Sequence, residues 1–339
     1  MTASDTGQSV DERLSLLTNW AKQHILSPIV TIEPASADAS FRRYFRIVHK
    51  RGSVIAMDSP PEQEPLNGFI AIARQLRAGG LRAPRVLASD LGSGFALLSD
   101  LGPSTYLNVL TEDAELADEL YGDAIHRLVG LQQRLDSSAL PPYDEALLRT
   151  ELGIFTEWLL GKHLNIQLSD EDRAQWATLC DGLVVSALDQ PRVFVHRDFH
   201  SRNLMRGPPG DPGILDFQDA VCGPITYDLV SLLRDCYVTW PAQSVSRWQA
   251  GYYDLATQTP LADVLPARDV FHTQFDLMGV QRHIKAAGIF ARLWHRDGKA
   301  GYLPDVPRTL AHILSVEHPS LNWLHGLLRE KVIPALKLK

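Results

Sequence analysis

The sequence has few cysteines and no long apolar run. Its three cysteines, Cys180, Cys222 and Cys236, show no C-x-x-C spacing, and this pattern argues against a disulfide framework or a zinc site. No apolar stretch approaches the roughly 20 residues that a membrane helix needs. The polar, acidic N-terminus lacks the basic start and apolar centre of a signal peptide. We therefore expect a cytoplasmic protein with reduced thiols and no membrane association.

Basic residues are too few for a protein that binds nucleic acid. The chain has 33 Lys and Arg against 40 Asp and Glu, a net charge of −7, whereas affinity for a phosphate backbone comes mainly from basic surface. With 339 residues, 45% hydrophobic and 22% charged, the composition is ordinary for a globular protein of one large or two medium domains. No obligate protein partner is evident, and we expect small-molecule ligands.

Two short polar segments each follow an apolar run that has the composition of a strand. The runs are residues 193–195 and 213–215; the first leads to Asp198 and Asn203, the second to Asp216. A hydroxyl that attacks the terminal phosphoryl group of ATP needs a carboxylate to take its proton, and Mg²⁺ needs oxygen ligands. We predict that Asp198 is the catalytic base and that Asn203 and Asp216 bind Mg²⁺.

The spacing supports this interpretation. HRDFHSRN matches the catalytic loop H-R-D-x-x-x-x-N of protein kinases, and DFQ stands where their metal-binding D-F-G is expected, with Gln218 in place of glycine. The alternative is two strands whose Asp and Asn residues only shape turns. Two matches in the right order, each after an apolar strand, favour a phosphoryl-transfer site. We expect His196 to hold the loop and Asp228 to cap and brace it.

Several segments carry a family resemblance. HRDFHSRN, ILDFQDA and GPITYDLVSLL resemble the aminoglycoside phosphotransferase and choline kinase branch of the kinase fold, which phosphorylates small molecules. SFRRYFRI, IAMDSPP, LLSDLG and QRHIKAAGIFARL resemble, within that branch, the sugar kinases that phosphorylate N-acetylmuramate and N-acetylglucosamine at C1 during cell-wall recycling. The resemblance implies a two-lobed, protein-kinase-like α+β fold. Residues 1–101 would form a small antiparallel-sheet, nucleotide-binding lobe with the hinge, and residues 102–339 a mostly helical catalytic and acceptor-binding lobe.

The N-terminal part departs from protein kinases at two places. The loop of residues 36–46, which would cover the phosphates, has no glycine, so that Ser36, Ala37, Ala39 and Ser40 must substitute for it, unless it is an ordinary hairpin. The strand of residues 55–58 carries Met57 and no lysine where protein kinases pair a lysine with the phosphates. We predict that Arg43 replaces this lysine, with Arg42 as the alternative and a solvated or Asp-paired arginine as the competing interpretation.

The segment LLSDLGP resembles the family's hinge. Adenine is flat and has a donor and acceptor edge, which extended backbone can bind through N–H and C=O groups. We predict that Ser99, Asp100 and Leu101 make these contacts.

Residue periodicity predicts the other elements. The predicted strands are residues 29–32, 44–48, 54–57, 85–88 and 95–98. The predicted helices are residues 10–26 with Ser9 and Glu12 as a capping box, a helix from Pro65 to Gly79, a stripe over 116–135, and residues 144–161, 170–188, 227–238 and 242–255.

The charge of residues 268–308 bears on the acceptor. This stretch has seven Lys or Arg and four Asp or Glu, which makes it +3 in a chain that is −7 overall. A site for a polycationic aminoglycoside is expected to be acidic, so a neutral or anionic acceptor is favoured; the carboxylate of N-acetylmuramate fits and choline does not. The candidate acceptor residues are His200 and Arg202 in the catalytic loop and Arg282 in QRHIKAAGIFARL. Gln281, Lys285, Arg292 and Arg296 lie near one helix face, which either binds the acceptor or is merely solvated.

Other functions stay open. A related kinase could act on an aminoglycoside, choline or homoserine, and a pseudokinase would bind ATP without turnover, because the strand lysine is missing. A protein kinase is disfavoured, because no A-P-E segment follows the metal-binding motif. Retention of Asp198, Asn203 and Asp216 together favours an active enzyme.

Overall fold

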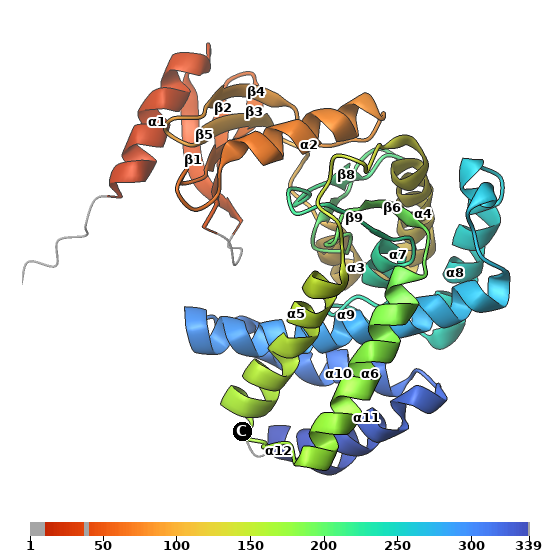
Figure 1. The fold of residues 1–339 in the computed structure, drawn as a ribbon. Coiled ribbons are helices and arrows are strands. Elements are labelled where there is room, and N and C mark those ends of the chain that lie inside the picture. The colour runs from red at the N-terminus through yellow and green to blue at the C-terminus, as the bar shows by residue number, and fades with distance from the viewer. Residues whose placement is uncertain (1–10, 37–40, 338–339) are drawn as a thin grey trace, which may run out of the picture. The chain divides into compact units, whose positions relative to one another are not determined.

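The computed structural model describes residues 11–36 and 41–337 and divides into two compact units. One comprises residues 1–77 and 83–101, the other residues 78–82 and 102–339 (Figure 1). Ser9, the predicted capping residue, and Ala37, Ala39 and Ser40, the predicted phosphate loop, lie outside the described residues.

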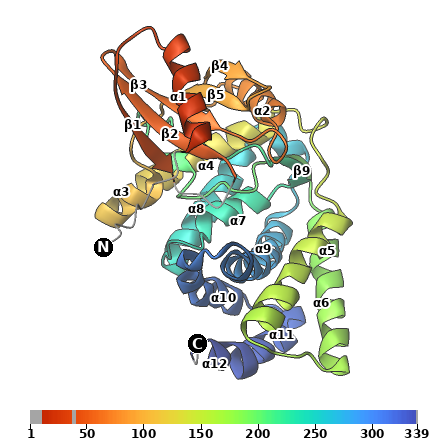
Figure 2. The same ribbon diagram turned by 90° about the vertical axis from the view of Figure 1, so that its left-hand side faces the viewer.

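The N-terminal unit is built on an antiparallel sheet, as predicted. Its strands follow the order β1-β2-β3-β5-β4, and the helix α1 covers the sheet by packing Leu17 and Ala21 against Phe45 and Leu97 (Figures 1 and 2). The Asp11 carboxylate accepts the N–H of Leu14 at 3.0 Å and caps this helix. The elements are α1 Glu12–His24, β1 Ile29–Ser36, β2 Arg43–His49, β3 Gly52–Asp58, α2 Leu66–Ala78, β4 Val86–Asp90 and β5 Phe95–Ser99.

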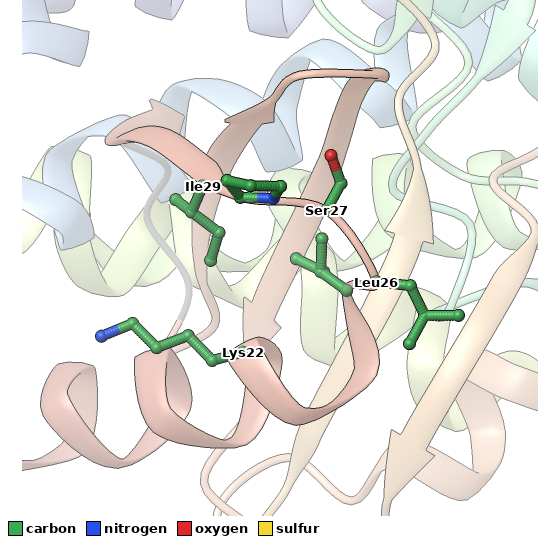
Figure 3. A pocket seen from close by; sticks show the side chains of 6 residues that line it. Lys22, Leu26, Ser27 and Ile29 are labelled. Atoms are coloured by element: carbon green, nitrogen blue, oxygen red, sulfur yellow. The ribbon is translucent and has the colours of Figure 1, made fainter.

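The connection from α1 to β1 borders a pocket of about 460 Å³ (Figure 3). Lys22, Ile25, Leu26, Ser27, Pro28 and Ile29 line it. None of the residues predicted to bind the nucleotide is among them, and Leu26 is 92% exposed. The pocket therefore gives no support to a nucleotide site at this position.

The second unit is mostly helical, as the resemblance implies. Its α-helices are α3 Tyr106–Glu112, α4 Ala117–Arg134, α5 Glu145–Ile154, α6 Asp170–Leu188, α7 Tyr227–Leu233, α8 Ala242–Ala256, α9 Arg268–Asp297, α10 Val306–Leu314, α11 Asn322–Leu327 and α12 Ile333–Leu336. Short 3₁₀ or π-helical segments are Ala114–Leu116, Phe155–His163, Pro260–Asp263, Ala300–Asp305, Pro319–Leu321 and Leu328–Val332. Within the described residues, no helix combines the length and the apolar character needed to cross a bilayer.

The predicted helices form with two differences in length. The helix predicted over 144–161 is α-helical only to Ile154 and continues as the π-helical segment Phe155–His163. The helix predicted over 227–238 ends at Leu233, because the chain turns there and Asp235 accepts the N–H of Tyr237 at 2.9 Å. Figure 1 shows the long helix α9 in blue, and it contacts α5, α6, α7 and α10.

Four short strands support the catalytic loop. The two strands that we predicted before the polar segments, residues 193–195 and 213–215, do not pair with each other. β6, Arg192–Val195, pairs with β9, Val221–Pro224, whereas β7, Leu204–Met205, pairs with β8, Gly213–Ile214. The Gly/Pro-rich segment of residues 207–213, which we interpret from the sequence as a tight connection between the two predicted catalytic strands, therefore joins β7 to β8 instead. Asp198 and Asn203 lie between β6 and β7, and Asp216 follows β8.

Candidate active site

Asp198 follows β6 on a turn that the sequence holds in an unusual conformation. Arg197 has a φ of 76°, in the left-handed region, which costs a residue other than glycine about 1–3 kcal/mol. The Asp228 carboxylate accepts the backbone N–H of His196 at 2.6 Å and that of Arg197 at 2.9 Å. Asp228 therefore braces the turn, and its place inside α7 shows that it does not cap this helix.

His196 has the structural role that we predicted. It is fully buried, and its Nδ1 lies 3.2 Å from the backbone N of Asp198. Burial lowers the pKa of His196 to about 4, so the imidazole is neutral at neutral pH and accepts this bond.

Asn203 and Asp216 lie side by side, next to the Asp198 backbone. The Nδ2 of Asn203 is 3.0 Å from the Asp198 carbonyl oxygen and 3.3 Å from Oδ2 of Asp216. The Nε2 of Gln218, the residue in place of the D-F-G glycine, donates to Oδ1 of Asp216 at 2.8 Å. Asp216 is exposed and has a φ of 60°. Because the amide nitrogen makes both Asn203 bonds, its oxygen and the Asp216 carboxylate are hard donors that fit Mg²⁺.

The surroundings of Asp198 favour its charged form. Burial acts to raise the pKa of Asp198, but His200, Lys285, Arg282 and Arg197 lower it, and the net shift is downward. The side chain is nevertheless 44% exposed, so a substrate can reach it. Asp198 is thus an ionised, accessible carboxylate at neutral pH.

The candidate acceptor residues of the catalytic loop lie among aromatic rings. The His200 Nε2 is 3.9 Å from Oδ1 of Asp198, and its ring meets the Tyr237 ring edge-on with 5.4 Å between centroids. The guanidinium carbon of Arg202 lies 4.6 Å from the Tyr237 centroid and 5.4 Å from that of Tyr302. Arg202 is therefore held by cation–π contacts. It is linked to Asp198 only indirectly, through Tyr237 and His200.

Arg282 is placed differently. It lies in α9, is only 6% exposed, and its Nη1 is 3.6 Å from the sulfur of Cys236. Its Nε is buried and makes no hydrogen bond within the described residues. Arg282 is thus a buried cation, and its charge acts to lower the pKa of Asp198.

Glu151 is a polar residue of this region that sequence reasoning missed. It is 3% exposed, contacts Arg197, and its Oε1 lies 2.8 Å from Lys285 Nζ. A signal was available, because Glu151 interrupts the apolar stripe of Leu148, Leu152 and Phe155, where a lone acid needs buried partners.

The helix face of residues 281–296 is not uniformly solvated. Gln281 is fully buried and Lys285 is 12% exposed at the side chain, and both bind Glu151. Arg296 is exposed and pairs with Asp297 at 2.8 Å. The solvated interpretation therefore holds for Arg296, whereas Gln281 and Lys285 are engaged with Glu151, and acceptor binding by this face stays a prediction.

The arginines predicted to replace the strand lysine are paired with acids. Arg43 donates to the buried Asp58 at 2.6 Å and also contacts Asp11. Arg42 is 3.0 Å from Glu64. The Asp-paired arginine is thus what the structure contains, and a role of Arg43 in phosphate binding stays a prediction.

Of the predicted hinge residues, Ser99 ends a strand of the N-terminal sheet and Asp100 contacts the sheet through its side chain. Ser99 donates its N–H to the Arg85 carbonyl at 2.9 Å, and its hydroxyl accepts the Arg85 N–H at 2.8 Å. Asp100 accepts from Arg46 at 2.7 Å and from the Ser53 hydroxyl at 2.7 Å. Leu101 is half-buried. The Ser99 N–H is therefore committed within the sheet.

Comparison with known proteins identifies relatives along most of the chain. The profile of the phosphotransferase enzyme family matches residues 31–263. An N-acetylmuramate/N-acetylglucosamine kinase of Pseudomonas aeruginosa is 49% identical over 303 residues, which are 89% of this chain and 88% of that protein. A protein of the same name from Pseudomonas putida is 44% identical over 94% of this chain and 97% of its own length.

Solved structures agree on the fold. The ADP-bound aminoglycoside phosphotransferase APH(2'')-Ib has a TM-score of 0.58 at 15% identity, over 89% of this chain and 97% of its own. Choline kinase LicA from Streptococcus pneumoniae has a TM-score of 0.62 at 13% identity, over 89% of this chain and 99% of its own. These likenesses confirm the predicted two-lobed, protein-kinase-like fold class.

Proposed function

Given that this chain belongs to the phosphotransferase enzyme family, we propose that it transfers the γ-phosphoryl group of ATP to the C1 hydroxyl of N-acetylmuramate, N-acetylglucosamine or both. The observation that carries the proposal is the position of Asn203, whose amide is within hydrogen-bond distance of both the Asp198 carbonyl oxygen and the Asp216 carboxylate. A cytoplasmic role in cell-wall recycling is part of the proposal, and it rests on the resemblance.

The proposed reaction needs one base. Asp198 orients the sugar hydroxyl and takes its proton while the oxygen–Pγ bond forms and the bond to the β-phosphate oxygen breaks, which releases ADP. A lowered pKa makes Asp198 a weak base, but phosphoryl transfer depends more on positioning than on strong proton abstraction. The C1 hydroxyl of a reducing sugar is also more acidic than an ordinary alcohol. A single ionised carboxylate is therefore adequate.

Asn203 and Asp216 would hold Mg²⁺, which neutralises the phosphate oxygens when bound. Arg43, Ser99, Asp100 and Leu101 remain our proposed nucleotide contacts, although the N–H of Ser99 is bonded to the Arg85 carbonyl and is not among the contacting groups. His200, Arg202 and Arg282 are the proposed acceptor residues. Their positive or neutral character agrees with a neutral or anionic sugar.

The Asp198→Ala variant separates this enzyme from a pseudokinase. It should keep its affinity for ATP, measured by calorimetry, and lose about 100- to 10,000-fold in turnover, measured as sugar-dependent ADP release. Retained sugar phosphorylation in a folded Asp198→Ala protein would overturn the assignment of the base. Wild-type ADP release that depends on choline, homoserine or an aminoglycoside, and not on a sugar, would instead support the second candidate function, another small-molecule kinase of this fold.

A further inference from the structure

Glu151 is a buried carboxylate that joins the catalytic loop to two helices. It lies in α5, contacts the Arg197 guanidinium, and is 2.8 Å from Lys285 Nζ in α9. Its other oxygen accepts from Gln281 Nε2 at 3.3 Å and from the Tyr143 hydroxyl. An ionised acid with a 4% exposed side chain is costly to bury without such partners. The contacts of Glu151 therefore fix its position and that of Arg197 together.

The same network holds both the side chain and the backbone of Arg197, the residue before Asp198. Glu151 holds the side chain of Arg197, while Asp228 holds its backbone N–H. Lys285 also donates to the Tyr227 hydroxyl at 3.0 Å, and Tyr227 precedes Asp228 at the start of α7. Loss of the carboxylate at position 151 would release the side chain of Arg197, whose φ is unfavourable.

The network also sets the charge beside the base. Arg197 and Lys285 bring two positive charges to one carboxylate, so a net positive charge remains next to Asp198. The charged or titratable groups that act on Asp198 include His196, His200, Lys285, Arg282, Arg197 and Asp228. Removal of one of these cations therefore weakens the stabilisation of the Asp198 carboxylate.

We propose that Glu151 and Lys285 are positioning residues that keep the catalytic loop in its active form, in place of a phosphorylated activation loop. In protein kinases, an added phosphate pairs with arginine and orders the active site. Here the acid belongs to the chain itself, so the loop is ordered without modification. This inference rests on the proposed role of Asp198 as the base.

The direct test is Glu151→Gln, with Glu145→Gln as a matched control on the same helix. Glu145 is a surface acid, 58% exposed at its side chain, that pairs with Arg149. In Glu151→Gln, kcat should fall by about 10- to 100-fold because the loop loses its position. The KM values for ATP and sugar should change by less than about threefold. Glu145→Gln should keep the wild-type kcat, and wild-type enzyme treated with a phosphatase should keep its rate.

Lys285→Met provides a second test that retains the Glu151–Arg197 pair. It removes the cation that pairs with Glu151 and donates to the Tyr227 hydroxyl, so kcat should fall by about tenfold while the KM values for ATP and sugar change by less than about threefold. Lys285→Arg keeps a cation at this position and should recover most of the lost kcat, which a loss of packing alone would not predict. In the double variant Glu151→Gln/Lys285→Met, the fold loss of kcat should be smaller than the product of the two single losses. The reason is that the lysine left unpaired by Glu151→Gln is then absent.

A folded Glu151→Gln protein with a kcat within about threefold of wild type would overturn the inference alone. A wild-type kcat in a folded Lys285→Met protein, or a rate that falls after phosphatase treatment, would do the same. If the wild-type protein itself phosphorylates no acceptor, the proposed function fails and this inference fails with it. The two failures are therefore distinguishable.

Discussion

The carboxylate of Asp228 accepts the backbone N–H of Arg197 at 2.9 Å, and it thereby fixes the residue that precedes the proposed base. The same carboxylate accepts the N–H of His196 at 2.6 Å. Both bonds need an acceptor oxygen, which a protonated acid offers less well. The protonation state of Asp228 should therefore control the catalytic loop.

We predict that kcat falls as the pH drops through about 7. Burial raises the pKa of Asp228 to about 7, although the N–H groups of His196 and Arg197 act to lower it. Above that pH the ionised carboxylate accepts both bonds, and below it the added proton weakens one of them. The measurement is kcat from about pH 5 to pH 9. Asp228→Asn cannot titrate, so it should show a lower kcat at high pH without this inflection. An inflection that persists in Asp228→Asn would contradict the assignment.

The metal assignment predicts a changed magnesium requirement in Asp216→Asn. One of two protein ligands loses its charge, so the Mg²⁺ concentration for half-maximal rate should rise by about tenfold or more. Asp219→Asn is the matched control, because Asp219 is an exposed acid in the same turn. Equal magnesium curves for Asp216→Asn and wild type would show that Asp216 is not a ligand.

The placement of Arg202 predicts a change in sugar preference. Its guanidinium is held near the rings of Tyr237 and Tyr302, and a charged partner there would favour the carboxylate of N-acetylmuramate. In Arg202→Gln, the ratio of kcat/KM for N-acetylmuramate to that for N-acetylglucosamine should fall by about tenfold. Arg206→Gln, which removes a surface pair with Glu119, is the control and should keep the wild-type ratio. Equal losses with both sugars in Arg202→Gln would exclude carboxylate recognition by this residue.

Close packing of α9 against the start of the 155–163 segment predicts a stability effect. A Cβ at Gly288 would lie 2.6 Å from the backbone N of Phe155, so Gly288→Ala should destabilise the protein by about 1–3 kcal/mol in urea unfolding. Gly153→Ala is the control in α5, because its Cβ would meet nothing within 4 Å, and a gain of up to about 1 kcal/mol is expected. A stable Gly288→Ala protein would mean that the two elements can move apart.

Much of this fold could be predicted from sequence, because its elements carry strong local patterns. The helix over residues 170–188 has a serine cap and forms at those bounds, and the N-terminal strands follow their β-branched and aromatic runs. The pairing of β6 with β9 could not be predicted, because both predicted catalytic runs are only a few residues long and either could pair with any nearby strand.

The candidate site was likewise predictable only where its residues are close in the sequence. Asp198 and Asn203 could be predicted because one short loop fixes their spacing, and Asp216 because it follows the next predicted strand. Glu151 and Arg197 are 46 residues apart, and no local pattern states that they meet. The pairing of Arg43 with Asp58 could not be predicted either, because a charged residue on a strand gives no indication of its partner.

The most direct test of the proposed function is phosphorus NMR of the purified protein with ATP, Mg²⁺ and a panel of acceptors. The panel comprises N-acetylmuramate, N-acetylglucosamine, kanamycin, choline and homoserine. We predict a new anomeric sugar-phosphate resonance with one or both amino sugars, together with release of ADP. A product formed only with kanamycin, choline or homoserine, or none with any acceptor, would contradict the proposal that this chain is a sugar 1-kinase.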